Sequence, residues 1–266
     1  MTPEQVKAAA QALDQAEKAR QQIRMLTIQH PDMTMDDAYA VQSAWVKHKL
    51  GQGRRVVGWK IGLTSKAMQQ ALNIDIPDSG VLLDDMAFAD GATVPMGRFI
   101  QPRIEAEIAF VMAKDLAGPN VTPADVLDAT DYVAPMIEIL DTRILRVDPE
   151  TKKTRTVFDT ISDNAANAGF VLGKRRHRPE STDLRWVGAI VSRNGEVEET
   201  GLGAGVLNDP ALSMAWLANR LALYGQSIKA GDIVLSGSFV RPVEAPSGSL
   251  ITADFGNFGD VSIRFA

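Results

Sequence analysis

Three glutamates stand in segments that otherwise have the composition of apolar strands. Glu105 and Glu107 lie in the run RIEAEIAFVM, and Glu138 lies in the run YVAPMIEIL. Because alternate residues of a strand project from the same face, the carboxylates of Glu105 and Glu107 are expected side by side. Two buried like charges repel each other, so a cation between them is expected. Carboxylate oxygens in a chain without cysteine suit Mg²⁺ or Mn²⁺ better than Zn²⁺.

A solvated strand face is the alternative explanation of the Glu105 and Glu107 pair. Antiparallel sheets often carry one polar face, and most exposed glutamates bind no metal. Glu138 favours a metal site, because it is the only charged residue between Asp131 and Asp141. A lone acid in an apolar strand is more often functional than incidental. The sequence alone does not establish that the two strands are neighbours.

Two further residues are candidates for the chemistry. Lys60 lies in the apolar run VVGWKIGL between Gly58 and Gly62. It either extends to solvent or faces the carboxylates, and glycines inside a strand indicate close approach by a ligand or by backbone. Asp78 belongs to the sequence PDSG, which predicts a turn over residues 77–80. Asp78 is therefore either a turn former or a proton-transfer acid.

Groups that could hold a substrate follow later in the chain. The segment Ser236-Gly237-Ser238 could offer backbone N–H groups to a carboxylate, which makes Ser238 a candidate binding residue. Asn, Asp and Ser residues gather at 162–167, within the long polar segment 141–167, and predict a site loop. Arginines that could grip a carboxylate in bidentate fashion, or could be ordinary surface charges, are Arg143, Arg155 and Arg241.

Composition narrows the class of protein. The 266 residues are 45% hydrophobic and 23% charged, which fits one large globular domain or a small domain fused to a larger one. The net charge of -5 offers no basic surface for nucleic acid, and no apolar run is long enough to span a bilayer. We therefore expect a cytoplasmic protein without nucleic-acid or membrane partners. The three histidines have no metal-ligand spacing, so Asp, Glu, Lys or water must move protons.

The expected elements place these residues in an α+β fold. Helix-forming composition over 4–24 and a capped helix from Thr34 to Gly51 predict an N-terminal helical lobe over residues 1–53. Residues 54–266 are expected to form a β-rich catalytic domain. Its expected elements are a strand at 54–63, a helix at 65–73, strands at 104–112 and 132–140 with a helix from Thr122 between them, a hairpin turn at Asn194-Gly195 and a helix at 210–224.

The chain resembles the hydratase/decarboxylase branch of the fumarylacetoacetate hydrolase superfamily over nearly its whole length. The segments that carry the resemblance are GWKIGLTSKAMQ, PDSGVLLDDM, QPRIEAEIAFV, DPETKKTRTVFDTISDNAANAG and WLANRLA. The resemblance implies a mixed β-roll core with peripheral helices. It also implies Mg²⁺ or Mn²⁺ held by Glu105, Glu107 and Glu138, and a homo-oligomer that is up to a decamer in size.

The resemblance also implies an activity. The expected reaction is the addition of water to C4 of 2-oxohept-4-ene-1,7-dioate, a 2-oxo dicarboxylate of aromatic catabolism. Lys60 would stabilise developing negative charge and Asp78 would shuttle a proton, while Ser162 or Asn164 would orient water. Arg143 or Arg155 would bind the distal carboxylate. The alternatives are a 2-hydroxypenta-2,4-dienoate hydratase, a decarboxylase of 4-oxalocrotonate type, and a partner subunit in a hydratase–decarboxylase complex.

Overall fold

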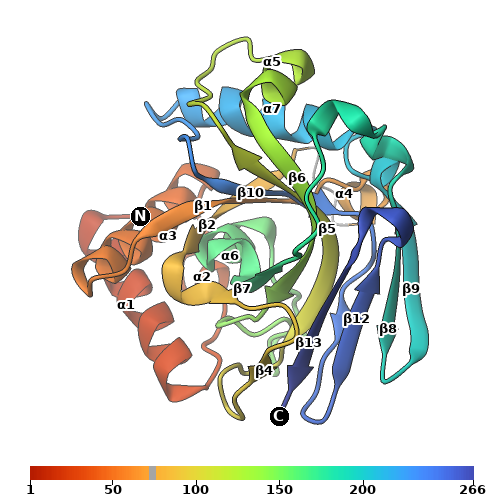
Figure 1. The fold of residues 1–266 in the computed structure, drawn as a ribbon. Helices are drawn as coiled ribbons and strands as arrows, with labels where there is room; N and C mark the ends of the chain where they lie inside the picture. The colour runs from red at the N-terminus through yellow and green to blue at the C-terminus, as the bar shows by residue number, and fades with distance from the viewer. Residues whose placement is uncertain (72–75) are drawn as a thin grey trace.

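The computed structural model describes residues 1–71 and 76–266 and has helices at its N-terminal end and strands through most of the remainder (Figure 1). The α-helices are α1 (Pro3–Ala19), α2 (Leu26–Gln29), α3 (Met35–Gly51), α4 (Lys66–Ala71), α5 (Pro123–Ala129), α6 (Val157–Ser162) and α7 (Pro210–Ala222). The last two residues of the helix expected at 65–73 lie outside the described residues. The expected α+β class is confirmed.

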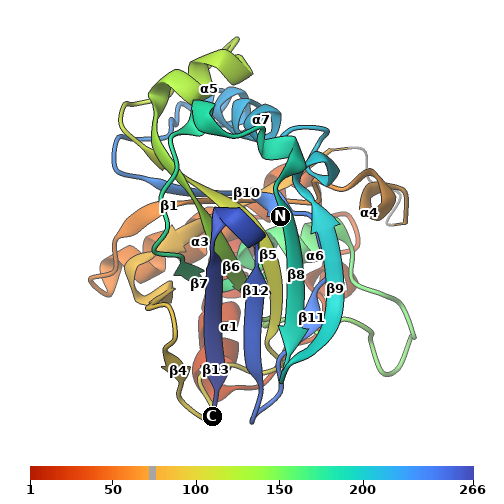
Figure 2. The same cartoon turned by 45° about the vertical axis from the view of Figure 1, so that its right-hand side comes forward.

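Two sheets build the β-roll. The larger has the strand order β2-β1-β10-β5-β6-β7-β3, with β11 pairing β5, and the smaller has the order β4-β13-β12-β8-β9. Figure 2 shows the smaller sheet lying across the curled larger one. The strands are β1 (Val56–Gly62), β2 (Asp78–Leu83), β3 (Ala87–Phe88), β4 (Thr93–Val94), β5 (Arg103–Met112), β6 (Thr130–Leu140), β7 (Asn167–Leu172), β8 (Gly188–Arg193), β9 (Glu196–Leu202), β10 (Ile233–Ser238), β11 (Val243–Glu244), β12 (Leu250–Asp254) and β13 (Asp260–Phe265).

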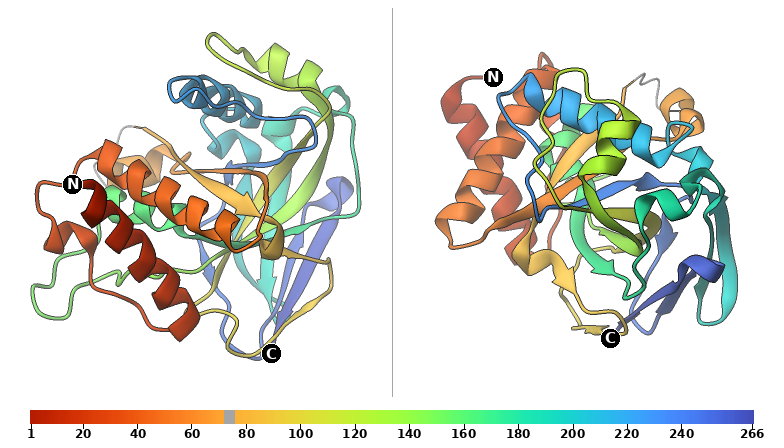
Figure 3. Two further views of the ribbon diagram at one scale, coloured as in Figure 1. Left: turned by 90° about the vertical axis from the view of Figure 1, so that its left-hand side faces the viewer. Right: turned by 45° about the horizontal axis from the view of Figure 1, so that its top comes forward.

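The two faces of strand β5 belong to two different apolar cores. Ile104 and Phe110 point into the core that the larger sheet shares with the smaller sheet, α5 and α7. Ala109, on the opposite face, belongs to the core that includes Leu13 of α1 and Trp45 of α3. The glutamates at 105 and 107 alternate in phase with Ala109, so they project towards the side of the sheet that α1 and α3 cover (Figure 3).

The helices begin where local capping predicts. Thr34 and Asp37 form a reciprocal capping box at the start of α3, and Thr122 with Asp125 forms another at α5. Helix α1 ends at Ala19 instead of continuing to residue 24, because Arg20 adopts a left-handed conformation that closes it. The boundary expected near residue 53 stays a prediction, although α1 and α3 share their core with the larger sheet.

Two expectations about loops are wrong. Residues 78–83 form strand β2, paired antiparallel to β1, where a turn over 77–80 was expected. Every residue of β2 is buried, and ladder pairing inside the core outweighs the turn propensity of Asp, Ser and Gly. The expected loop over 141–167 contains helix α6, which is capped by Thr156 and Asp159 and packs on α3.

Among the described residues, no helix is both long enough and apolar enough to cross a membrane.

Candidate metal and active site

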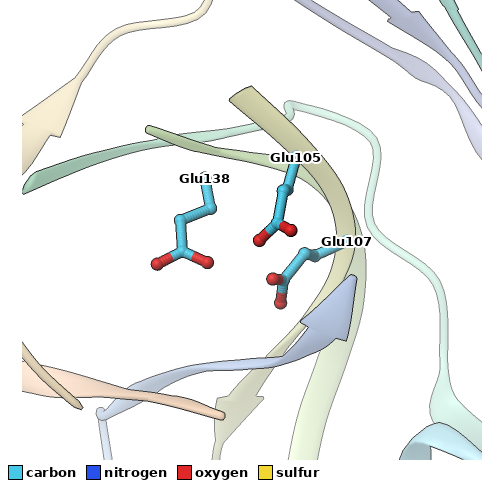
Figure 4. A group of neighbouring side chains, drawn as sticks. All are labelled: Glu105, Glu107 and Glu138. Atoms are coloured by element: carbon cyan, nitrogen blue, oxygen red, sulfur yellow. The ribbon is translucent and has the colours of Figure 1, made fainter. Parts of the chain in front are cut away.

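Strand pairing brings the three glutamates together. Strands β5 and β6 pair antiparallel, with Glu105 directly opposite Glu138 and Glu107 opposite Met136. Each glutamate offers a carboxylate oxygen within 4.8 Å of the others, and the three carboxylates point towards one another (Figure 4). The neighbouring strands that the metal site requires are therefore present.

Burial leaves this cluster with unpaired oxygens. Glu107 and Glu138 are fully buried, and Glu105 is half-buried. The Gly237 backbone N–H donates to Glu107 Oε2, and Asn167 Nδ2 donates to Glu138 Oε1, each at 2.7 Å. Glu107 Oε1 and Glu138 Oε2 are buried and have no hydrogen-bond partner among the described residues. Since unpaired buried acceptors are costly, these oxygens fit a hard divalent cation.

The electrostatics of the cluster also favour a positive charge beside the carboxylates. Burial raises the pKa of Glu105 to about 8, and repulsion from Glu138 contributes in the same direction. Burial likewise raises the pKa of Glu107 well above its ordinary value, and Glu138 and Glu105 add to the rise. A bound divalent cation reverses such shifts, because its charge favours the ionised carboxylates.

Lys60 faces the cluster instead of extending to solvent. Its side chain is buried, and its Nζ lies 3.5 Å from Glu138 Oε1. Burial lowers the pKa of Lys60, but the charges of Glu138 and then of Asp78 outweigh this effect and raise it overall. Lys60 is therefore a buried ammonium at the edge of the carboxylate cluster.

Asp78 is the second group beside the cluster. It pairs with Gly62 across strands β1 and β2, and its Oδ1 is buried without a hydrogen-bond partner among the described residues. A Cβ on Gly62 would lie 2.2 Å from Asp78 Oδ1 and 3.0 Å from Lys60 Nζ, so both groups crowd that glycine. Burial raises the pKa of Asp78, while Lys60 opposes the rise. An acid with a raised pKa next to an ammonium is suited to proton transfer.

The glycines that flank Lys60 mark close approaches, as expected. Gly62 leaves room for Asp78, and a Cβ on Gly58 would lie 1.7 Å from the backbone oxygen of Ile233. Gly58 therefore permits the close packing of β1 on β10, and Gly62 leaves room for the side chains of Asp78 and Lys60.

The predicted water-orienting residues are used within the protein. Ser162 Oγ donates to the backbone oxygen of Phe158 in α6. Asn164 accepts from the Val81 N–H at 2.8 Å and donates to the Val81 oxygen at 2.9 Å, so its amide holds strand β2 in place. A role for either residue in orienting water stays a prediction.

The two predicted carboxylate-binding arginines differ in their surroundings. Arg143 is buried, stacks over Trp45, and bonds to the Asp163 carboxylate and to the backbone oxygens of Asp163 and Asn167. Arg155 instead keeps a buried Nη1 with no partner among the described residues. Arg241, the third candidate, is exposed and pairs with Glu199.

Ser238 and Glu105 line one cavity of about 170 Å³. Ser238 Oγ donates to the Val240 oxygen at 2.8 Å. The backbone donor expected in this segment is present at Gly237, and its acceptor is the protein's own Glu107.

Asn167 is a residue of the site that sequence reasoning did not single out. It is fully buried, and its amide orients Glu138. The polar cluster at 162–167 predicts a site loop, but the pattern gives its last residue no separate role. Nothing local distinguishes Asn167 from Asn164, because the contact to Glu138 comes from the pairing of β6 and β7.

Comparison with known proteins supplies the family. The chain is 57% identical over 256 residues to a 2-oxo-hept-4-ene-1,7-dioate hydratase of Escherichia coli, covering 96% of each chain. It is 42% identical to a 2-keto-4-pentenoate hydratase of Paraburkholderia xenovorans (strain LB400), over 100% of this chain and 96% of that one.

A solved structure of a related protein has the same fold. The 4-oxalocrotonate decarboxylase from Pseudomonas putida G7, complexed with magnesium and adipate, matches with a TM-score of 0.94 at 38% identity, covering 100% of this chain and 99% of that chain. Residues 58–266 match the family described as fumarylacetoacetate (FAA) hydrolase C-terminal. On its residues, its fold and these likenesses, the chain belongs to the fumarylacetoacetate hydrolase family.

Proposed function

We propose that this protein is a metal-dependent hydratase that adds water to C4 of 2-oxohept-4-ene-1,7-dioate and gives 4-hydroxy-2-oxoheptanedioate. The observation that carries the proposal is the buried pair of Lys60 and Asp78 beside the three glutamates, in a chain 57% identical to a hydratase of that name. The reaction needs a group that moves a proton and a positive charge that stabilises the C2 oxygen, and this pair supplies both.

The metal is proposed to be Mg²⁺ or Mn²⁺, held by Glu105, Glu107 and Glu138. The unpaired buried oxygens of Glu107 and Glu138 support such an ion. When bound, it supplies Lewis-acid chemistry at the 2-oxo acid end of the substrate. Asn167 and the Gly237 N–H orient two of the three carboxylates, in the way that outer partners tune metal ligands.

The residues of the chain account for the proton transfers. The substrate carries its double bond between C4 and C5. Asp78 takes a proton from C3 and returns one to C5, which moves the double bond to C3 and C4, in conjugation with the C2 carbonyl. Water then adds its oxygen to C4 and its proton to C3. The Lys60 ammonium stabilises the negative charge that develops on the C2 oxygen during both steps.

Decarboxylation is the principal alternative, since the Pseudomonas putida G7 decarboxylase has the same fold and 38% identity. Metal-free protein mixed with 2-oxohept-4-ene-1,7-dioate, with and without added Mg²⁺, is followed by NMR. A metal-dependent signal from a hydroxyl-bearing C4 supports the hydratase. Metal-dependent release of CO₂ assigns the chain to decarboxylation, and activity only on mixing with a decarboxylase assigns it to a partner subunit.

Substitution of one glutamate tests the metal site separately. Glu107→Gln is expected to lower metal affinity and activity together, each by more than about 100-fold, because a ligand contributes more than its outer partners do. Glu196→Gln, on an exposed position of β9, is the matched control. Full activity of Glu107→Gln without added metal contradicts the assignment.

A further inference from the structure

Strand β2, which carries Asp78, is the edge strand of the larger sheet. It pairs antiparallel with β1 and stands at the end of the strand order. An edge strand has one row of backbone N–H and C=O groups without a strand partner. Because every residue of β2 is buried, unpaired groups in this row would be costly. Other parts of the protein must therefore bind the open edge.

Two side-chain amides bind this edge in place of a strand. Asn164 bonds to both the N–H and the oxygen of Val81. Gln42 Nε2, from α3, donates to the Ser79 oxygen at 2.8 Å. Since Ser79 and Val81 are two residues apart on an extended strand, their backbone groups point to the same edge. The open edge of β2 is therefore held at two successive positions of one row.

Gln42 is an unusual residue for its place in α3. It lies on the buried face of the helix with the apolar residues Ala38, Val41 and Trp45, and its exposed fraction is 5%. A buried amide is unfavourable unless it is hydrogen-bonded. Its Nε2 also donates to the oxygen of Ile161 in the last turn of α6, at 3.0 Å, where helix carbonyls lack helical partners. One amide thus joins α3, β2 and α6 (Figure 1).

The position of β2 sets the spacing of the proton-transfer groups. Ser79 stands between Asp78 and Gly80, which pair with Gly62 and Lys60 of β1. A Cβ on Gly80 would lie 3.1 Å from Lys60 Cγ, so β2 packs closely against the lysine. A displacement of Ser79 away from β1 therefore moves Asp78 away from Lys60.

We propose that Gln42 is a positioning residue for proton transfer, which holds Ser79 in place and thereby fixes Asp78 against Lys60. The inference rests on the proposed function, in which Asp78 moves the proton. It gives the N-terminal helices a part in the reaction through α3. Both bonds of the Gln42 amide go to backbone oxygens of β2 and α6, whereas the glutamates come from β5 and β6. A change at Gln42 should therefore leave the metal site intact.

Gln42→Met tests the proposal, because it keeps the length of the side chain and removes both donors. Its kcat for 2-oxohept-4-ene-1,7-dioate should fall about 10- to 100-fold, since displacements near 1 Å have effects of this size. Its KM and its Kd for Mg²⁺ should change less than about threefold, because only the reacting groups have moved.

Gln22→Met is the matched control. Gln22 is half-buried and also donates its amide to a backbone oxygen, that of Thr142 at 2.9 Å. It should keep the kcat of wild type. An equal fall of kcat in the two variants, or a loss of Mg²⁺ affinity in Gln42→Met as large as its loss of kcat, overturns the proposal.

Hydrogen exchange followed by mass spectrometry tests the same contact without turnover. In Gln42→Met the amides of β2 should exchange at least about 10-fold faster, because local opening becomes less costly, while those of β5 and β6 keep their rates. Gln42→Asn, which keeps the amide on a shorter side chain, should show the same changes to a smaller extent and replaces Gln42→Met if that variant does not fold.

The exchange measurement separates this inference from the proposed function. If wild type hydrates no substrate but β2 alone is loosened in the variant, the proposed function fails and the hold of Gln42 on β2 stands. If the exchange of β2 is unchanged, the positioning role fails whatever the activity.

Discussion

At the scale of single residues, hydrogen bonds orient two of the three clustered carboxylates: Asn167 Nδ2 donates to Glu138, and the Gly237 N–H donates to Glu107. The hydrogen bond from Asn167 Nδ2 goes to Glu138 Oε1, and Lys60 Nζ lies 3.5 Å from the same oxygen. The other oxygen of Glu138 stays open among the described residues. The geometry of the carboxylate is therefore set before any metal binds, which reduces the reorganisation that binding requires.

Removal of the Asn167 amide tests this orientation. Asn167→Ala is expected to weaken metal binding about 10- to 100-fold, because outer partners of metal ligands have effects of that size. Competition with a metal-sensitive dye measures the affinity. Asn120→Ala, on an exposed loop, serves as a control, and an unchanged affinity in Asn167→Ala would show that the hydrogen bond to Glu138 has no such role.

Gly62 tests the spacing of the catalytic pair. In Gly62→Ala the new methyl group would lie 2.2 Å from Asp78 Oδ1, so the acid or Lys60 must move. Activity should fall at least about 100-fold, since displacements near 1 Å have effects of this size. Gly51→Ala is the matched control, because a Cβ there meets nothing within 4 Å. Kinetics and thermal melting together separate a displaced site from an unfolded protein.

At the scale of elements, helices α1 and α3 are joined by a buried ion-pair group. Asp14 of α1 forms ion pairs with Lys49 of α3 at 2.9 Å and with Lys18 of α1 at 2.5 Å. Burial raises the pKa of Asp14, but Lys18 and Lys49 outweigh it and lower the value to about 2. In the unfolded chain, aspartates have a pKa of about 3.9. The folded protein therefore binds a proton at Asp14 less readily than the unfolded chain does.

This difference predicts a pH-dependent stability. Because the pKa is depressed on folding, the contribution of Asp14 is fully present above about pH 4 and is lost as the pH falls towards 2. Solvent around the exposed Lys18 limits the contribution to about 1 kcal/mol. Urea unfolding of wild type and Asp14→Asn should differ by this amount at pH 7 and should converge between about pH 4 and 2. A difference that stays constant down to pH 3 contradicts the assignment.

At the scale of the whole molecule, the site lies where one face of the larger sheet meets the N-terminal helices. The glutamates come from β5 and β6, Lys60 and Asp78 from β1 and β2, and all of these strands belong to one sheet. Metal binding should therefore stabilise the complete fold, because the ligands come from chain segments far apart in sequence.

Thermal melting measures that stabilisation. Mg²⁺ at about 100 times its Kd should contribute about 2.7 kcal/mol, which corresponds to a rise in Tm of about 5–10 °C for a chain of this size. A chelator should reverse the rise, and Glu107→Gln should show little of it. An equal rise in wild type and Glu107→Gln would mean that the ion acts elsewhere on the protein.

The expected homo-oligomer stays a prediction. Sedimentation velocity measures the oligomeric state and tests it. Apolar side chains exposed on or next to β8 and β9 are Trp186, Ile190, Val197 and Leu202. Exposed apolar side chains that lie close together often mark contacts between subunits.

The sequence by itself determined the features that depend on neighbouring residues. Alternation placed Glu105 and Glu107 on one face of β5, and capping residues located the starts of α3 and α5. The apolar setting of Glu138 indicated that this acid is functional. These features follow from backbone periodicity and local hydrogen bonding, which a short segment carries within itself.

Only the tertiary structure decided which distant residues meet. Pairing of β5 with β6 aligned Glu105 with Glu138, and pairing of β6 with β7 brought Asn167 to Glu138. Burial turned the PDSG segment into strand β2 instead of a turn, and thereby put Asp78 beside Lys60. It also committed Arg143 to Asp163, whereas Arg155 Nη1 is buried without a hydrogen-bond partner among the described residues. Strand register and desolvation are properties of the packed chain, and they override local preference wherever the two differ.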